Sequence, residues 1–145
     1  MLKQLLCASA VTCLTLPSWA LAAVPTFSGK YSYAIQILCE ASKSYGGQYE
    51  HDIGTGTFDS GTQMLTVKGL KDTGDITVGA GFSESTVKST TAYSNDATTI
   101  TFFGVTYNVV YSVVKTGVVQ QANWMGLNTN SAGASCTERG NFVKE

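Results

Sequence analysis

The residues whose types and spacing could do chemistry lie in the first half of the chain. Asp59-Ser60-Gly61-Thr62 and Asp72-Thr73-Gly74 place a carboxylate in an Asp-Ser/Thr-Gly sequence, as general acid–base hydrolysis by a pair of carboxylates would need. The only histidine, His51, stands between Glu50 and Asp52, in a polar trio that suggests a base or a metal ligand. Each group must be weighed against an ordinary structural role.

The two aspartate motifs are better explained as turns. An aspartic protease of two lobes takes one motif from each lobe, and this chain is too short for two lobes. Asp72 also follows Leu70-Lys71 rather than an apolar strand. In tight turns Asp caps backbone amides and Gly takes a positive φ. Asp59, Asp72 and Asp75 lack the alternating ligands of a dedicated calcium loop, so we expect solvated hairpin turns at these positions.

The trio around His51 is expected in a solvent-facing loop. A structural zinc site needs four ligands and a catalytic one needs three, and no further histidine is present. A serine or cysteine nucleophile would have to use this same histidine, and nothing in the spacing supports that pairing. We therefore expect no catalytic residue, no metal site and no cofactor, and a protein that is not an enzyme.

Residues 1–23 have the three-part layout of a secretory signal peptide. Lys3 supplies the positive charge, residues 5–16 form an apolar stretch, and Ala20-Leu21-Ala22 offers small residues for cleavage after Ala22 or Ala23. The apolar stretch is shorter than the ~20 residues that span a bilayer, which makes a membrane anchor the weaker alternative. The expected mature chain, residues 24–145, is one domain that is secreted or periplasmic, with no stable membrane insertion after cleavage.

Cysteine use and charge constrain that domain further. Cys7 and Cys13 would leave with the leader, so Cys39 and Cys136 remain, and an exported chain with two cysteines is expected to join them in a disulfide. The formal net charge of the whole chain is −1. Such a balance gives no electrostatic footprint for nucleic acid or an anionic membrane, so nucleic acid is not an expected partner.

The elements that must position all these residues are β-strands. The mature part is rich in Thr, Ser, Val, Tyr and Gly, which favour strands over helices. Between residues 27 and 39 the odd positions are mostly apolar and the even ones mostly polar, which is the two-residue period of a half-buried strand. A single turn of helix at residues 40–44 and a turn at 94–97 are also expected. The expected strands are 27–39, 48–58, 63–69, 75–79, 84–93, 98–103, 105–115, 117–125 and 135–143.

These segments predict an all-β, antiparallel up-and-down barrel of about eight or nine strands. Turn signals recur at short intervals with no helix between them, a pattern typical of a barrel or a sandwich. Cys39 ends the first strand and Cys136 begins the last, so pairing these two strands brings the cysteines together and places Phe142 opposite Tyr33. A β-sandwich with a disulfide between its sheets is the alternative.

The two ends of the domain resemble the calycin group, the lipocalins and fatty-acid-binding proteins. Phe27-Ser28-Gly29-Lys30-Tyr31 resembles their opening Gly-x-Trp strand, with Tyr31 in place of the Trp. Cys136-Thr137-Glu138-Arg139 is similar to the end of a fatty-acid-binding barrel. The resemblance implies a small barrel architecture and a late arginine, Arg139, that meets a ligand or braces the first strand.

The aromatic residues remain as the candidate binding site. A closed barrel would turn seven of them inward, where they either line a small-ligand cavity or fill the core. The first hypothesis is a non-enzymatic exported protein that binds a small apolar molecule or a protein partner. The alternatives are an adhesin-like structural subunit of the cell surface and a periplasmic enzyme inhibitor that uses the loop at residues 128–134. The seven aromatic residues are Tyr31, Tyr33, Phe102, Tyr107, Tyr111, Trp124 and Phe142.

Overall fold

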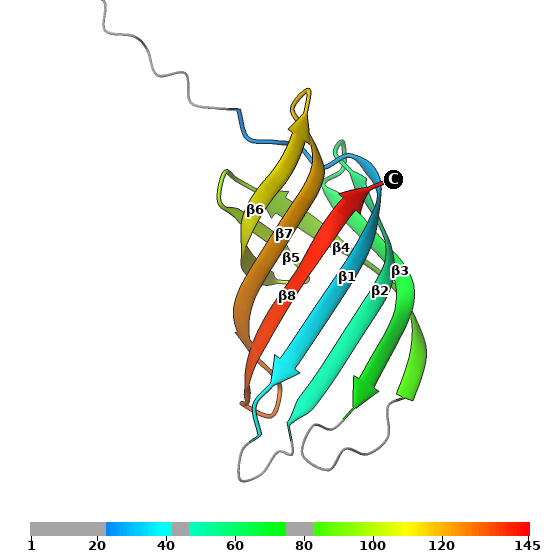
Figure 1. Ribbon diagram of the computed structural model, residues 1–145, viewed down its shortest axis with the longest axis vertical. Helices are drawn as coiled ribbons and strands as arrows, with labels where there is room; N and C mark the ends of the chain where they lie inside the picture. The colour runs from blue at the N-terminus through cyan, green and yellow to red at the C-terminus, as the bar shows by residue number, and fades with distance from the viewer. Residues whose placement is uncertain (1–22, 42–46, 75–82) are drawn as a thin grey trace, which may run out of the picture.

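The chain forms one closed antiparallel barrel, seen in a computed structural model that describes residues 23–41, 47–74 and 83–145. Each strand pairs with its neighbours in sequence, and the last strand pairs with the first (Figure 1). The predicted barrel is confirmed, and the sandwich alternative is wrong. The strands are β1 (Gly29–Cys39), β2 (Gln48–Asp59), β3 (Met64–Gly74), β4 (Ser83–Asn95), β5 (Thr99–Phe102), β6 (Val105–Lys115), β7 (Val118–Thr129) and β8 (Ser135–Lys144).

The closure between β1 and β8 has the predicted register. Cys39 lies directly opposite Cys136 and Tyr33 opposite Phe142. The two cysteines form a disulfide that links positions 97 residues apart in sequence. The odd positions of β1 face the interior of the barrel, since Tyr31, Tyr33 and Cys39 are all buried.

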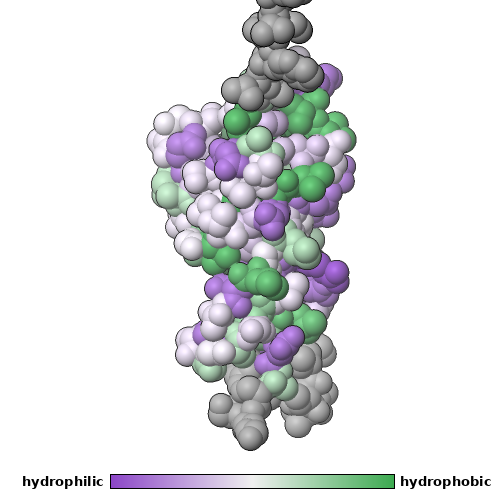
Figure 2. All heavy atoms as spheres, turned by 90° about the vertical axis from the view of Figure 1, so that its left-hand side faces the viewer, coloured by the Kyte–Doolittle hydropathy of each residue, from purple (hydrophilic) through white to green (hydrophobic). Residues whose placement is uncertain are grey.

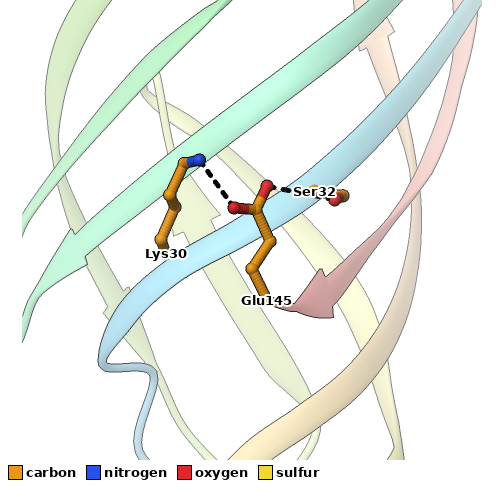
Figure 3. Close-up of polar contacts among 3 residues, drawn as sticks. All are labelled: Lys30, Ser32 and Glu145. Carbon is orange, nitrogen blue, oxygen red and sulfur yellow. Dashed lines mark hydrogen bonds and ion pairs between the residues drawn. The ribbon is translucent and has the colours of Figure 1, made fainter.

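The β1–β8 seam is also held on its outer face. Lys30 forms a 2.6 Å ion pair with the side chain of Glu145, and Ser32 donates a 3.2 Å hydrogen bond to the same carboxylate (Figure 3). The hydrogen bond from Lys30 is the main reason that the pKa of Glu145 lies below its usual range. These exposed contacts add little stability, but they fix the end of β8 against the start of β1.

Two local predictions for the middle of the chain are wrong. Asp72-Thr73-Gly74 is not a turn, because β3 continues to Gly74 and pairs with residues 49–51 of β2. His51 is not in a loop but within β2, where it lies opposite Gln36 and Asp72. Cross-strand pairing on both sides thus overrides local turn chemistry. The expected strand at 75–79, most of the helical turn at 40–44, and the leader up to residue 22 with Cys7 and Cys13 fall outside the described residues.

The other predicted turns form as hydrogen-bonded hairpins. Asp59 accepts hydrogen bonds from the amides of Gly61 and Thr62 at 2.9 and 3.2 Å, as expected for a capped turn. The positive φ in this turn belongs to Gln63, at 56°, and not to the glycine as expected. Asp96 caps the turn between β4 and β5 in the same way, because its side chain accepts hydrogen bonds from the amides of residues 98 and 99 at 2.7 Å each.

One half of the barrel interior, called here the filled half, contains buried aromatic and aliphatic side chains at the end where β1 begins and β8 ends. Phe27 is fully buried there and stacks on Phe58 with ring centroids 4.6 Å apart. It precedes β1 rather than belonging to it, because Gly29 takes a φ of 85° and turns the chain into the strand. The filled half consists of Phe27, Tyr31, Phe58, Leu65, Tyr93, Ile100, Val119, Ala122 and Phe142.

The outer surface mixes polar and apolar side chains. Figure 2 shows apolar patches separated by polar and small residues on one face of the molecule. Val110, Met125 and Leu127 are the most exposed large apolar side chains, at 66%, 55% and 80%. Within the described ranges, no helix is long and apolar enough to cross a membrane.

Candidate functional site

The other half of the barrel interior, where β1 ends and β8 begins, contains a cavity of about 320 Å³, called here the barrel cavity. Four of the seven aromatic residues singled out from the sequence surround it: Tyr33, Phe102, Tyr107 and Trp124. The interior is therefore neither wholly filled nor wholly open. The remaining lining residues are Ile35, Ile37, Glu50, Asp52, Val67, Val87, Ser89, Phe103, Val105, Asn128 and Glu138.

The other three aromatic residues lie away from the barrel cavity. Tyr31 and Phe142 are buried in the filled half, where the Tyr31 hydroxyl donates a 2.7 Å hydrogen bond to the Val119 carbonyl. Tyr111 packs against the edge of that half and donates to the carbonyl of Asp96 at 2.6 Å. These three positions share the inward face of their strands with the cavity residues but lie nearer the filled end.

Two carboxylates of β2, Glu50 and Asp52, face the cavity, although the sequence predicted both to lie in a solvent-facing loop. Strand alternation turns His51 outward and its neighbours Glu50 and Asp52 inward, opposite Ile37 and Ile35 of β1. Glu50 forms a 2.5 Å ion pair with Lys71 of β3. The signal that could have found them is the two-residue period that runs from Gln48 to Phe58, because Phe58 is buried and shares the parity of both acids.

Asp52 is the least compensated of these charges. Asp52 is only 9% exposed, and its Oδ1 atom has no hydrogen-bond partner among the described residues. Burial, and next the negative charge of Glu50, raise the pKa of Asp52 from 3.8 to about 6, while Lys71 and His51 act in the opposite direction. Ionisation of Asp52 is thus disfavoured in the fold, at a cost that the surrounding side chains do not offset.

A third carboxylate, Glu138 of β8, is held by uncharged donors. The Tyr107 hydroxyl donates to its Oε2 at 2.5 Å, and the Asn128 amide donates to its Oε1 at 3.1 Å. Burial is the main reason that the pKa of Tyr107 lies far above its usual value, and the bond to Glu138 raises it further. Glu138 therefore has a fixed position on the cavity wall, with each oxygen accepting one hydrogen bond.

Two buried donors complete the polar lining. The hydroxyl of Tyr33 and the indole Nε1 of Trp124 belong to residues that are 4% and 3% exposed, and neither has a partner within the described part of the chain. Burial, followed by the charge of Asp52, raises the pKa of Tyr33. The barrel cavity thus contains an unpaired acceptor and two unpaired donors on three different strands.

Inward-facing glycines make room for the rings around the cavity. A Cβ atom at Gly69 would lie 2.7 Å from the Tyr33 hydroxyl, and one at Gly126 would lie 2.8 Å from the Tyr107 ring. At Gly140 it would lie 2.4 Å from the Trp124 indole. The side chains of Tyr33, Tyr107 and Trp124 thus lie close against glycine backbone, where any side chain would displace them.

A shallow groove also lies on the outer face of β1, β2, β7 and β8. It has a volume of about 480 Å³ and is bordered by Ala34, His51, Arg139 and Asn141, among others. Arg139 donates a 2.6 Å hydrogen bond to Gln36 of β1. The late arginine therefore contacts the first strand from outside, and it does not line the barrel cavity.

The described residues 23–41, 47–74 and 83–145 contain no group of three His, Cys, Asp or Glu side chains close enough to hold a metal ion. The two Asp-Ser/Thr-Gly motifs lie in different places, Asp59 in the β2–β3 turn and Asp72 within β3. No protein-family model matches the chain, and no curated protein or solved structure is significantly similar to it. The resemblance to the calycin group rests on the two terminal motifs alone.

Proposed function

We propose that this protein is a non-enzymatic binding protein that holds a small organic molecule in the barrel cavity. The observation that carries the proposal is a single cavity lined by three residues, each of which has a buried polar atom without a partner among the described residues: Tyr33 (Oη), Asp52 (Oδ1) and Trp124 (Nε1). A bound molecule would supply the partners. The rest of the lining is mostly apolar, as ligand pockets are.

The energy balance supports this assignment over a merely imperfect core. Each buried polar group left without a partner costs about 1–3 kcal/mol, whereas the filled half of the same barrel is packed with buried apolar side chains. The cavity volume of about 320 Å³ also lies at the lower end of the range for ligand pockets, about 300–1,000 Å³. A ligand of one ring with a short polar chain suits that space.

The proposal includes an extracytoplasmic location, secreted or periplasmic. A disulfide between the first and last strands is compatible with an oxidising compartment. A binding protein in that setting would meet its ligand outside the cytoplasm.

Native mass spectrometry of the protein purified gently from its source tests the proposal. We expect a fraction of the protein to retain a small organic molecule. The variant Val87→Phe, which extends a ring into the cavity from β4, should lose it, whereas Thr86→Phe on the exposed outer face should keep it. A protein without any retained mass, or retention that survives Val87→Phe, would contradict the proposal.

A further inference from the structure

We propose that the ligand of the barrel cavity is a small organic cation, an ammonium compound whose charged end lies beside Asp52. This inference rests on the proposed function, and it names the chemical class of the molecule bound. Three features of the cavity lead to it: the balance of charges, the unpaired oxygen of Asp52, and the aromatic rings nearby.

The charges that face the interior near the cavity are mostly negative. Glu50, Asp52 and Glu138 line it, and Lys71, which shares their inward face, is engaged by Glu50. The hydrogen-bond donors to Glu138 are neutral groups. In a space with little water such charges act strongly on whatever enters, so the cavity attracts cations and repels anions.

Asp52 provides the specific contact. It is nine-tenths buried, and the atom that lacks a partner among the described residues, Oδ1, belongs to a side chain that lines the cavity. An ammonium N–H donated to the Asp52 carboxylate from the cavity would form a charge-assisted hydrogen bond, which is about twice as strong as a neutral one. The same contact would remove the cost of an uncompensated buried charge.

The aromatic wall suits a cation as well. Tyr33, Phe102, Tyr107 and Trp124 surround the same space, and a cation near the face of such rings gains about 0.5–2 kcal/mol. The Tyr33 hydroxyl and the Trp124 indole N–H would each be able to donate a hydrogen bond to an oxygen of the ligand, while Val67 and Val87 contact its hydrocarbon part. An aromatic or short-chain amine that carries an oxygen matches all of these groups.

Three soluble probes of nearly equal size test the inference: phenethylammonium, 2-phenylethanol and phenylacetate. In a chain that carries Trp19→Phe, Trp124 is the single tryptophan, and its fluorescence reports binding at the barrel cavity or the outer groove, both of which it lines. A fluorescence change that Val87→Phe abolishes is assigned to the cavity, because Val87 lines the cavity and not the groove. At a pH well above the pKa of Asp52, phenethylammonium should bind at least about tenfold more tightly than the alcohol, a difference of about 1.4 kcal/mol. Phenylacetate should bind most weakly.

Two variants separate the inference from the proposed function. Asp52→Asn should bring phenethylammonium to the affinity of 2-phenylethanol, whereas Asp72→Asn, which removes the same charge from the outer side of β3, should preserve the preference. If the alcohol binds as tightly as the amine, or Asp52→Asn keeps the preference, the inference is overturned and the binding function stands. If none of the probes changes the Trp124 fluorescence, both are contradicted.

Discussion

Lys71 lies directly opposite Asp52 in the register of β3 against β2, yet its ammonium pairs with Glu50 instead. The pairing leaves a carboxylate buried in the barrel cavity with no cation of the described chain in contact with its Oδ1 atom. A buried carboxylate without a paired cation lowers the free energy of unfolding unless a bound molecule supplies the positive charge. The proposed function and the proposed ligand class both follow from this relationship.

The uncompensated charge predicts that Asp52→Asn stabilises the protein at neutral pH. The pKa of Asp52 is about 6 in the folded protein and 3.8 ordinarily. Ionisation is thus harder in the folded state, and the free energy of unfolding falls as pH rises from about 4 to 6. At pH ~7.5 the variant should gain about 1–3 kcal/mol, and at pH ~3.5 the gain should disappear.

Urea unfolding of both proteins at the two pH values measures that difference. The groups that act on Asp52 are Glu50 and Asp72, which raise its pKa, and Lys71 and His51, which lower it. Asp72→Asn provides the control and should change the free energy of unfolding much less. A destabilised Asp52→Asn variant, or an equal gain at both pH values, would contradict the account.

The disulfide should contribute a large part of the stability. It closes a loop of 97 residues, for which chain-entropy arguments give about 4–5 kcal/mol. We expect Cys136→Ser, or reduction of the wild type, to lower Tm by about 10–20 °C in thermal unfolding followed by circular dichroism. An unchanged Tm together with two free thiols in the native protein would show that the strands close without the bond.

Phe27, at the filled end of the barrel, should behave as a core residue although it lies outside the strands. Phe27 is fully buried, and its carbonyl accepts a hydrogen bond from the Tyr93 hydroxyl at 3.1 Å. Phe27→Ala should cost about 3–5 kcal/mol in urea unfolding. The nearby Val24→Ala, at a site 45% exposed, should change the free energy of unfolding by less than about 0.5 kcal/mol. Equal effects of the two substitutions on the free energy of unfolding would contradict a core role for Phe27.

The glycines beneath the rings should differ in how well they tolerate a methyl group. At Gly69 a Cβ would lie 2.2 Å from the Ile53 carbonyl oxygen, which is backbone and cannot move aside. At Gly56 it would lie 3.3 Å from a methyl group of Leu65. Gly69→Ala should therefore cost about 2 kcal/mol or more and Gly56→Ala clearly less. The reverse order in chemical denaturation would show that the sheet adapts there.

Most of the architecture was predictable from two features of the sequence. The alternation of residues 27–39 determines which side chains of β1 face inward, and the positions of Cys39 and Cys136 then determine how the barrel closes. Both features are local and strong. The register that places Tyr33 opposite Phe142 follows from them without knowledge of the strands between.

The binding site was predictable only in part, because its polar half breaks the usual pattern. Glu50, His51 and Asp52 are three consecutive polar residues, which suggest a loop, and their place in β2 depends on pairing with β1 and β3. Asp72-Thr73-Gly74 has the composition of a turn for the same reason. Acids on an inward face run against hydrophobic patterning, and such departures are expected at functional sites.

A crystal structure of the protein with phenethylammonium bound would test the central claim most directly. The account predicts the molecule inside the barrel, with its nitrogen within hydrogen-bond distance of Asp52 Oδ1 and its ring among Tyr33 and Trp124. Binding in the outer groove beside His51 and Asn141, with the barrel cavity unchanged, would contradict it.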